Sequence, residues 1–355
     1  MQADKKIITD RIYIQSQINR DIPWIEKYRP RKLDEIVYQE ESISILFNTL
    51  KTGELPHLLI YGSPGTGKTS SILALCNELY GPRRVGERVI ELNASDERGI
   101  NVVRHKIINF AKVAIGSKDE NYLCPPYKII ILDEADAMTK EAQAALRKVM
   151  EETSNITRFC FICNYINQII EPINSRCVKI RFKPIDQTCI IGRLRLIAKN
   201  EKLNISNEAI ESIAKISSGD FRKSILMLQN IKYIKTDNIF GEENKKISKE
   251  DIYKMCKYIT QDELLGYINI LKDLTDKRPV IKKMLFITND IINKGFIFIS
   301  LINEIINYIV ESKIVKDKDK SKILFELSNI EKNINDGADE FINLLKIFDN
   351  IKTIL

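Results

Sequence analysis

The chain has 355 residues, of which 44% are hydrophobic and 29% are charged, a composition typical of soluble globular proteins with packed cores. This length suggests two or three domains of roughly 100–200 residues each. No apolar run approaches the roughly 20 residues that cross a bilayer, and the polar N-terminus does not resemble a signal peptide, so we expect no membrane association. The net charge of +7 favours an anionic partner such as nucleic acid only weakly.

The seven cysteines are an odd, scattered set, which argues against a disulfide framework and for a reducing compartment. Cys160 and Cys163 have C-x-x-C spacing, but they lie inside an apolar run, and no second pair is near them in the sequence. We interpret both as buried strand residues rather than as metal ligands or a redox pair.

Short apolar runs in the first half of the chain predict five strands, at residues 57–61, 88–92, 128–132, 158–163 and 177–182. Helical spacing of apolar residues predicts helices at 40–50, 70–79, 99–114 and 140–152. Strands that alternate with helices predict a parallel sheet with helices on both faces.

The strand pattern stops after Pro184. Three helices are predicted next, at residues 186–200, 206–217 and 221–232, and a glycine- and charge-rich linker follows at 241–249. Residues 252–355 are predicted to be all helical, with a solvated turn at the lysine- and aspartate-rich tract 315–322. The predicted fold class is therefore α/β followed by all-α.

A complete G-x-x-x-x-G-K-[ST] motif follows the first predicted strand and precedes a helix, which is the context that a P-loop requires. Its residues, with the serine after it, are Gly62, Ser63, Pro64, Gly65, Thr66, Gly67, Lys68, Thr69 and Ser70. Glycines let backbone N–H groups turn toward phosphates, and the helix N-terminus adds its positive dipole. We expect Lys68 to reach the β- and γ-phosphates of ATP and the Thr69 hydroxyl to bind Mg²⁺.

Two carboxylates, Asp133 and Glu134, end the third predicted strand. Beside a P-loop, Asp133 is expected to bind Mg²⁺ and Glu134 to polarise the attacking water. Asn164 ends the fourth predicted strand and is a candidate for holding that water near the γ-phosphate. Arg176 precedes the last strand and Arg222 opens a helix, and phosphoryl transfer needs positive charge beyond the P-loop lysine.

Six segments together resemble one family: residues 24–30 (WIEKYRP), the P-loop, 91–99 (ELNASDERG), 133–136 (DEAD), 175–177 (SRC) and 219–222 (GDFR). They recur in this order in small subunits of replication factor C, the eukaryotic and archaeal sliding-clamp loader, which is an AAA+ ATPase. Within the family, residues 124–126, 158–165 and 181–184 most resemble the paralogue numbered 4 in human.

The resemblance implies a role for several residues. Arg176 is similar in position to the arginine finger that acts on ATP of the neighbouring subunit, Arg222 to sensor 2, and Asn164 to sensor 1. Ile25, Arg29 and Val37 match positions that hold the adenine and a nearby phosphate. Four basic residues on or before the second helix are implied to follow the DNA backbone, with a solvated face as the alternative: Arg98, Arg104, Lys106 and Lys112.

The resemblance also implies four parts: a polar extension (1–22), an AAA+ nucleotide-binding domain (23–185), a helical lid (186–240) and a helical collar (250–355). The implied activity is ATP hydrolysis that opens the sliding clamp, PCNA, and loads it on primer-template DNA in replication and repair. The implied setting is a hetero-pentameric ring of replication factor C subunits in the nucleus.

Two alternatives stay open at this point. One is a different AAA+ machine on DNA, such as a branch-migration helicase or an origin initiator, which usually carries a C-terminal winged helix. The other is a subunit that binds nucleotide only as a scaffold.

Overall fold

The computed structural model describes residues 22–36, 39–94, 100–113, 120–236, 246–272, 277–312 and 315–352. The chain divides into two compact units, Met1–Asn244 and Lys245–Leu355. Val37 and Arg98, which the family resemblance matches to the adenine site and to DNA binding, lie outside the described residues.

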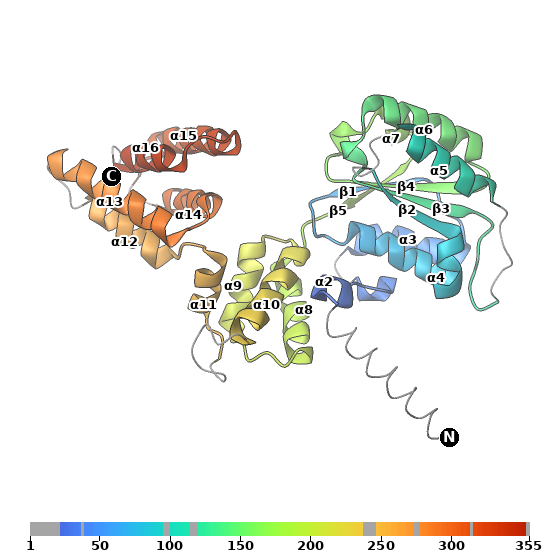
Figure 1. Cartoon of the computed structure of the whole chain (residues 1–355), viewed down its shortest axis with the longest axis horizontal. Coiled ribbons are helices and arrows are strands. Elements are labelled where there is room, and N and C mark those ends of the chain that lie inside the picture. Colours follow the sequence, from blue (N-terminus) through green and yellow to red (C-terminus); the bar gives the residue numbers. More distant parts are fainter. Residues whose placement is uncertain are drawn as a thin grey trace, which may run out of the picture. The chain divides into compact units, whose positions relative to one another are not determined.

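The first unit is built on a five-stranded parallel sheet in the order β2-β3-β4-β1-β5 (Figure 1). The strands are β1 (Leu58–Gly62), β2 (Val89–Asn93), β3 (Lys128–Asp133), β4 (Thr157–Cys163) and β5 (Val178–Phe182). The central strands β3 and β4 are apolar and buried along most of their length, as expected for parallel strands covered on both faces. The predicted parallel sheet is confirmed.

Helices cover both faces of this sheet (Figure 1). Helices α3 (Glu40–Thr52) and α4 (Lys68–Arg88) pack on one face, where Leu46 and Ile72 join the core with Ile129. Helices α5 (Ile100–Lys112), α6 (Lys140–Thr153) and α7 (Glu171–Asn174) lie on the other. The sheet is therefore held between two apolar layers, and its polar strand ends meet at one edge.

Helix α4 runs further than the sequence indicated, because a second helical segment follows a break at Gly81 (φ 72°) and Pro82. A proline in the first turn of a helix loses no hydrogen bond. A Cβ on Gly81 would approach the Tyr122 ring to 2.4 Å. The break therefore needs a glycine both for its conformation and for space.

Three lid helices follow the sheet: α8 (Gln187–Asn200), α9 (Asn207–Ser217) and α10 (Phe221–Thr236). Ser206 caps α9 by accepting a hydrogen bond from the Ala209 N–H. Before the sheet, the short helix α2 (Trp24–Lys27) lies against α10 (Figure 1), and the 3₁₀ turn η1 (Leu33–Glu35) contacts α4.

The second unit consists of six helices among the described residues, and all of them except the first share one apolar core. They are α11 (Lys249–Cys256), α12 (Gln261–Lys272), α13 (Lys277–Lys294), α14 (Phe298–Glu311), α15 (Asp317–Asn335) and α16 (Glu340–Lys352). No helix among the described residues is long and apolar enough to cross a membrane.

The predicted turn at 315–322 is wrong, because α15 begins at Asp317. Asp317 and Asp319 lie in its first turn, where negative charge favours a helix. Each carboxylate also lies 4.0 Å from a lysine three residues later, Lys320 and Lys322. An alternating charge run is thus compatible with a helix start as well as with a turn.

Candidate nucleotide site

A cavity of about 320 Å³ lies where the carboxyl ends of β1, β3 and β4 face the lid. Parallel sheets bind ligands at this edge, and the volume is in the range of roughly 300–1,000 Å³ of ligand pockets. Sequence-predicted residues that line it are Ile25, Arg29, Pro64, Gly65, Thr66, Gly67, Lys68, Thr69, Ser70, Asp133, Glu134, Asn164 and Arg222.

The P-loop connects β1 to α4, and two of its glycines, Gly65 (φ 69°) and Gly67 (φ 93°), have left-handed backbone conformations. Gly62 and Ser63 contribute through their carbonyl oxygens, which both accept hydrogen bonds of 2.9 Å from Lys68 Nζ. Helix α4 begins at Lys68, so its N-terminal N–H groups and its dipole face the cavity.

Lys68 is buried and is held from three sides. Besides the two carbonyls, its Nζ donates to Asn164 Oδ1 at 3.0 Å. Burial lowers the pKa of Lys68, and the nearby carboxylates of Asp133 and Asp136 act in the opposite direction. These carboxylates favour the charged ammonium that a phosphate ligand would meet.

The Thr69 hydroxyl donates a 2.7 Å hydrogen bond to Asp133 Oδ2. A hydroxyl and a carboxylate that converge at the P-loop are hard oxygen ligands of the type that Mg²⁺ prefers. The donor set therefore fits a magnesium ion.

Two carboxylates after Asp133 differ in role. Glu134 has a left-handed backbone (φ 53°), and its exposed side chain lines the cavity. Asp136 instead accepts hydrogen bonds from the backbone N–H groups of Asn164 and Tyr165, at 3.0 and 3.1 Å. Asp136 thus connects the end of β4 to the segment after β3. It holds the backbone from which the Asn164 side chain extends.

The lid touches the P-loop directly. The Phe221 N–H at the start of α10 donates to the Gly65 carbonyl at 3.2 Å, and a Cβ on Gly65 would lie 1.8 Å from Asp220 Oδ1. Arg222 and Arg193, on α10 and α8, complete the lid side of the cavity. The cavity is therefore enclosed by groups from the sheet and from the lid.

Sequence reasoning missed eight lining residues: Tyr28, Pro30, Glu35, Ile36, Ile185, Arg193, Phe221 and Ile225. Arg193 adds a fourth cation to Arg29, Lys68 and Arg222. Arg193 lies on an ordinary amphipathic helix, and no local sequence pattern marks it as a nucleotide-site residue. Tyr28 and Pro30 lie within the WIEKYRP segment, so the resemblance was the one available signal for them.

Arg176 is placed apart from the residues that line this cavity. Its guanidinium lies 2.8 Å from Glu151 Oε1 on α6 and donates to the Pro172 carbonyl at 2.8 Å. The side chain is 42% exposed, so it is accessible to another molecule.

The candidate DNA residues lie on α5 where the structure describes them. Lys106 and Lys112 are exposed, whereas Arg104 lies in α5 with a side chain outside the description. The end of α5 is fastened by the buried Lys128, whose Nζ donates to the Phe110 and Val113 carbonyls at 2.6 Å each. A cation at the C-terminus of a helix is favourable for its dipole.

Cys160 and Cys163 are both buried in β4, as the sequence predicted. Burial raises the pKa of Cys163 to about 12, and the Asp136 carboxylate acts in the same direction. Both features describe structural thiols rather than reactive ones.

Comparison with known proteins agrees with this geometry. The family described as "ATPase family associated with various cellular activities (AAA)" matches residues 58–185, an AAA+ ATPase lid family matches 192–233, and "Replication factor C C-terminal domain" matches 247–348. "Replication factor C subunit 4" of Homo sapiens is 44% identical over 92% of this chain and 87% of that protein. The chain belongs to the replication factor C family.

Other replication factor C proteins match over the same span. "Replication factor C subunit 2" of Oryza sativa subsp. japonica is 44% identical over 92% of each chain, and that of Schizosaccharomyces pombe is 39% identical over 96% of each. The subunit number thus differs among the organisms that match. The AAA match and these replication factor C relatives identify the chain as an ATPase.

Among solved structures, RuvB variants of Thermotoga maritima share the fold. One has a TM-score of 0.52 at 18% identity and covers 69% of this chain and 79% of that chain. Likeness at this identity extends to the fold alone. The replication factor C match over residues 247–348 decides against the branch-migration helicase and the origin initiator.

Proposed function

We propose that this chain is a small subunit of a hetero-pentameric clamp loader, in which ATP binding and hydrolysis open the sliding clamp, PCNA, and load it on primer-template DNA. The proposed setting is replication and repair in the nucleus. The proposal rests on two observations taken together. The chain belongs to the replication factor C family, and residues of the P-loop, the strand ends and the lid line one cavity.

In this proposal the triphosphate lies along the P-loop from Pro64 to Ser70, whose N–H groups and helix dipole bind it. Lys68 holds the β- and γ-phosphates. Thr69 and Asp133 would hold Mg²⁺, which neutralises phosphate charge when it is bound. The 2.7 Å contact between their oxygens supports this assignment.

For hydrolysis, we assign Glu134 to orient and polarise water, because its carboxylate is exposed at the cavity wall. Asn164 holds the same water near the γ-phosphate and keeps Lys68 in place. Arg222 acts on phosphate in the same chain from the lid. Together these groups stabilise the charge that develops during phosphoryl transfer.

Arg176 is assigned to the ATP of the adjoining subunit. Its accessible guanidinium and its separation from the lining of this chain's cavity support action in trans. The scaffold alternative is disfavoured, because Lys68, Asp133, Glu134, Arg176 and Arg222 are all present.

The proposed DNA surface includes Arg98, Arg104, Lys106 and Lys112. Contacts of lysine and arginine with phosphates are independent of base sequence and weaken as salt rises. The proposed parts are the extension (1–22), the AAA+ domain (23–185), the lid (186–240) and the collar (250–355), of which the collar would join the subunits.

The test is the ATPase rate of the complex purified with its partner subunits, with and without the clamp and primer-template DNA. We expect the clamp and the DNA to raise the ATPase rate. We expect Lys68→Ala to reduce this stimulation, because the variant removes the contribution of this chain's own site. Lys51→Ala, an exposed lysine at the end of α3, is the matched control. An ATPase rate that does not change when the clamp and DNA are added would contradict the proposal.

A further inference from the structure

Residues 22–36, here called the N-terminal strap, form one wall of the nucleotide cavity. Ile25, Tyr28, Arg29 and Pro30 line the cavity from this strap. A four-residue helix such as α2 has little stability of its own. Contacts with the rest of the protein must therefore fix its position.

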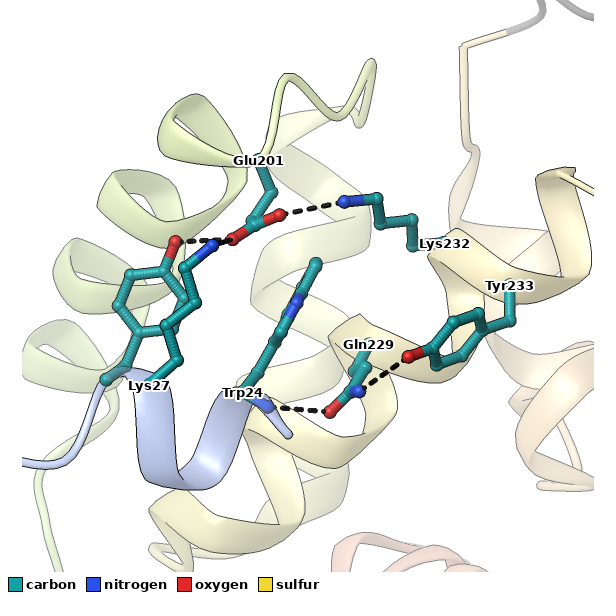
Figure 2. A network of polar contacts seen from close by, with 7 residues as sticks. Trp24, Lys27, Glu201, Gln229, Lys232 and Tyr233 are labelled. Carbon is teal, nitrogen blue, oxygen red and sulfur yellow. Dashed lines mark hydrogen bonds and ion pairs between the residues drawn. The ribbon is translucent and has the colours of Figure 1, made fainter. Parts of the chain in front are cut away.

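The strap is fastened to the lid at Glu201, the C-cap residue of α8 (Figure 2). One carboxylate oxygen of Glu201 accepts hydrogen bonds from Lys27 Nζ at 2.5 Å and from Tyr28 Oη at 2.8 Å. The other oxygen accepts from Lys232 Nζ of α10 at 2.8 Å. The Glu201 side chain is 6% exposed, so this carboxylate is largely removed from solvent.

Charge matters at this buried carboxylate. Burial alone would raise the pKa of Glu201, but the hydrogen bonds from Lys232, Lys27 and Tyr28 outweigh it and lower the pKa to about 2. Glu201 is therefore ionised at neutral pH. Charge-assisted hydrogen bonds are about twice as strong as neutral ones.

Trp24 makes a second contact between the strap and the lid, next to the contact at Glu201. Its ring is buried, and Lys232 Nζ lies 5.2 Å from the ring centroid. The backbone N–H of Trp24 donates to Gln229 Oε1 at 3.1 Å, and Gln229 Nε2 in turn donates to Tyr233 Oη at 3.0 Å (Figure 2). Lys232 thus contacts both Glu201 and Trp24.

The far end of the strap is fastened to the P-loop domain instead. Leu33 is buried in the core between the sheet and α4, and its N–H donates to Glu78 Oε1 at 2.6 Å. The cavity-lining Arg29 and Pro30 lie between this anchor and the one at Glu201. The position of this wall of the cavity therefore depends on both anchors.

We propose that Glu201, which lies outside the cavity lining, is a positioning residue for nucleotide binding, because it fastens the base-facing strap to the lid. This inference rests on the proposed nucleotide site. It predicts that weakening the Glu201 anchor costs affinity for the base end of ATP and spares the phosphate end, which the P-loop holds.

The test compares two ligands on the full-length chain: ATP, and inorganic triphosphate, which lacks the base. Glu201→Gln keeps the shape of the side chain and removes its charge. We expect the Kd for ATP to rise about tenfold, the size expected when a hydrogen bond to a charged group is weakened. We expect the Kd for triphosphate to stay within about twofold of the unmodified chain.

The matched control is Glu211→Gln, which removes the charge of an exposed lid carboxylate 3.8 Å from Arg195. Both Kd values should remain unchanged in this variant. Equal losses for ATP and triphosphate in Glu201→Gln would show general damage to the lid and overturn the proposal. Unchanged binding of both ligands would also overturn it.

A second variant keeps the test decisive if Glu201→Gln does not fold. Lys27→Met removes one of the donors from a side chain that is 41% exposed, and we expect a rise of about threefold in the Kd for ATP alone. Unchanged ATP binding in Lys27→Met would then count against the anchor. If the unmodified chain bound neither ligand, the proposed nucleotide site itself would fail.

Discussion

Asn164 Oδ1 accepts a 3.0 Å hydrogen bond from Lys68 Nζ, which joins the end of β4 to the P-loop lysine. Asp136 fixes the backbone of Asn164 from the other side. The side-chain amide is therefore held at the wall of the cavity, near the ammonium that would meet the γ-phosphate.

Replacing Asn164 tests this contact. For Asn164→Ala we expect kcat to fall by about 10–100-fold through loss of water positioning, while the Kd for ATP changes by less than about threefold because backbone groups of the P-loop supply most of the binding. The measurement is steady-state ATPase activity together with equilibrium binding. Asn48→Ala, on the exposed side of α3, serves as control, and a loss confined to ATP binding would refute the assignment.

The hydroxyl of Thr69 is expected to matter through Mg²⁺. Thr69→Val keeps the branched shape and removes the oxygen, so the Mg²⁺ concentration for half-maximal ATPase activity should rise by about tenfold or more. Thr69→Ser keeps the oxygen and should remain near the unmodified value. A Mg²⁺ titration of all three proteins measures this, and equal behaviour of the valine and serine variants would count against the metal role.

Replacing Arg176 is expected to slow ATP hydrolysis at the site of the neighbouring subunit. In complexes assembled with Arg176→Ala, hydrolysis at the adjoining subunit should slow by at least about 10³-fold, the contribution of an arginine finger, while this chain binds ATP as before. Single-turnover hydrolysis and nucleotide binding by this chain are the two readouts. Loss of ATP binding in the same chain would instead indicate action in cis.

Gly65 is expected to tolerate no side chain. In Gly65→Ala the Cβ would meet Asp220 Oδ1 at 1.8 Å in a left-handed backbone conformation (φ 69°), so ATP affinity should fall by at least about tenfold. Gly86→Ala has open space around the new Cβ and should retain affinity and gain slight stability. Isothermal titration and thermal unfolding distinguish them, and normal ATP affinity in Gly65→Ala would contradict the close approach of the lid.

His57 is expected to lower the stability of the folded protein as the pH becomes acidic. Its Nδ1 accepts a hydrogen bond from the Phe159 N–H at 3.1 Å, and burial, followed by the charge of Arg158, lowers its pKa to about 4. An unfolded histidine titrates near pH 6.5, so between about pH 6.5 and 4 the unfolded chain binds a proton that the folded chain does not. Stability from this group is therefore complete above pH 6.5 and falls as pH decreases toward 4.

Urea unfolding at several pH values measures this dependence. His57→Gln keeps an acceptor for Phe159 and should make the decline in stability between pH 6.5 and 4 shallower. His105→Gln, at an exposed position on α5, should leave the slope as it is. An unchanged slope in His57→Gln would mean that other groups cause the decline.

Much of the phosphate site was predictable because its signals are local. Glycine spacing from Gly62 to Gly67 sets the loop, and an apolar strand that ends in Asp133 and Glu134 brings carboxylates to the same sheet edge. Arg176 and Arg222, by contrast, were singled out by the family resemblance and by the charge that phosphoryl transfer needs. Their roles stay predictions.

The sequence by itself determined the parallel sheet, the P-loop and the helical second half, because each depends on periodicity or on spacing within a few residues. Only the tertiary structure decided that α15 begins at Asp317, that Arg193 lines the cavity, and that Glu201 fastens α2 to the lid. Glu201 lies 174 positions from Lys27 in the sequence. No local pattern encodes such a pair, because the contact forms only once the strap and the lid have packed together.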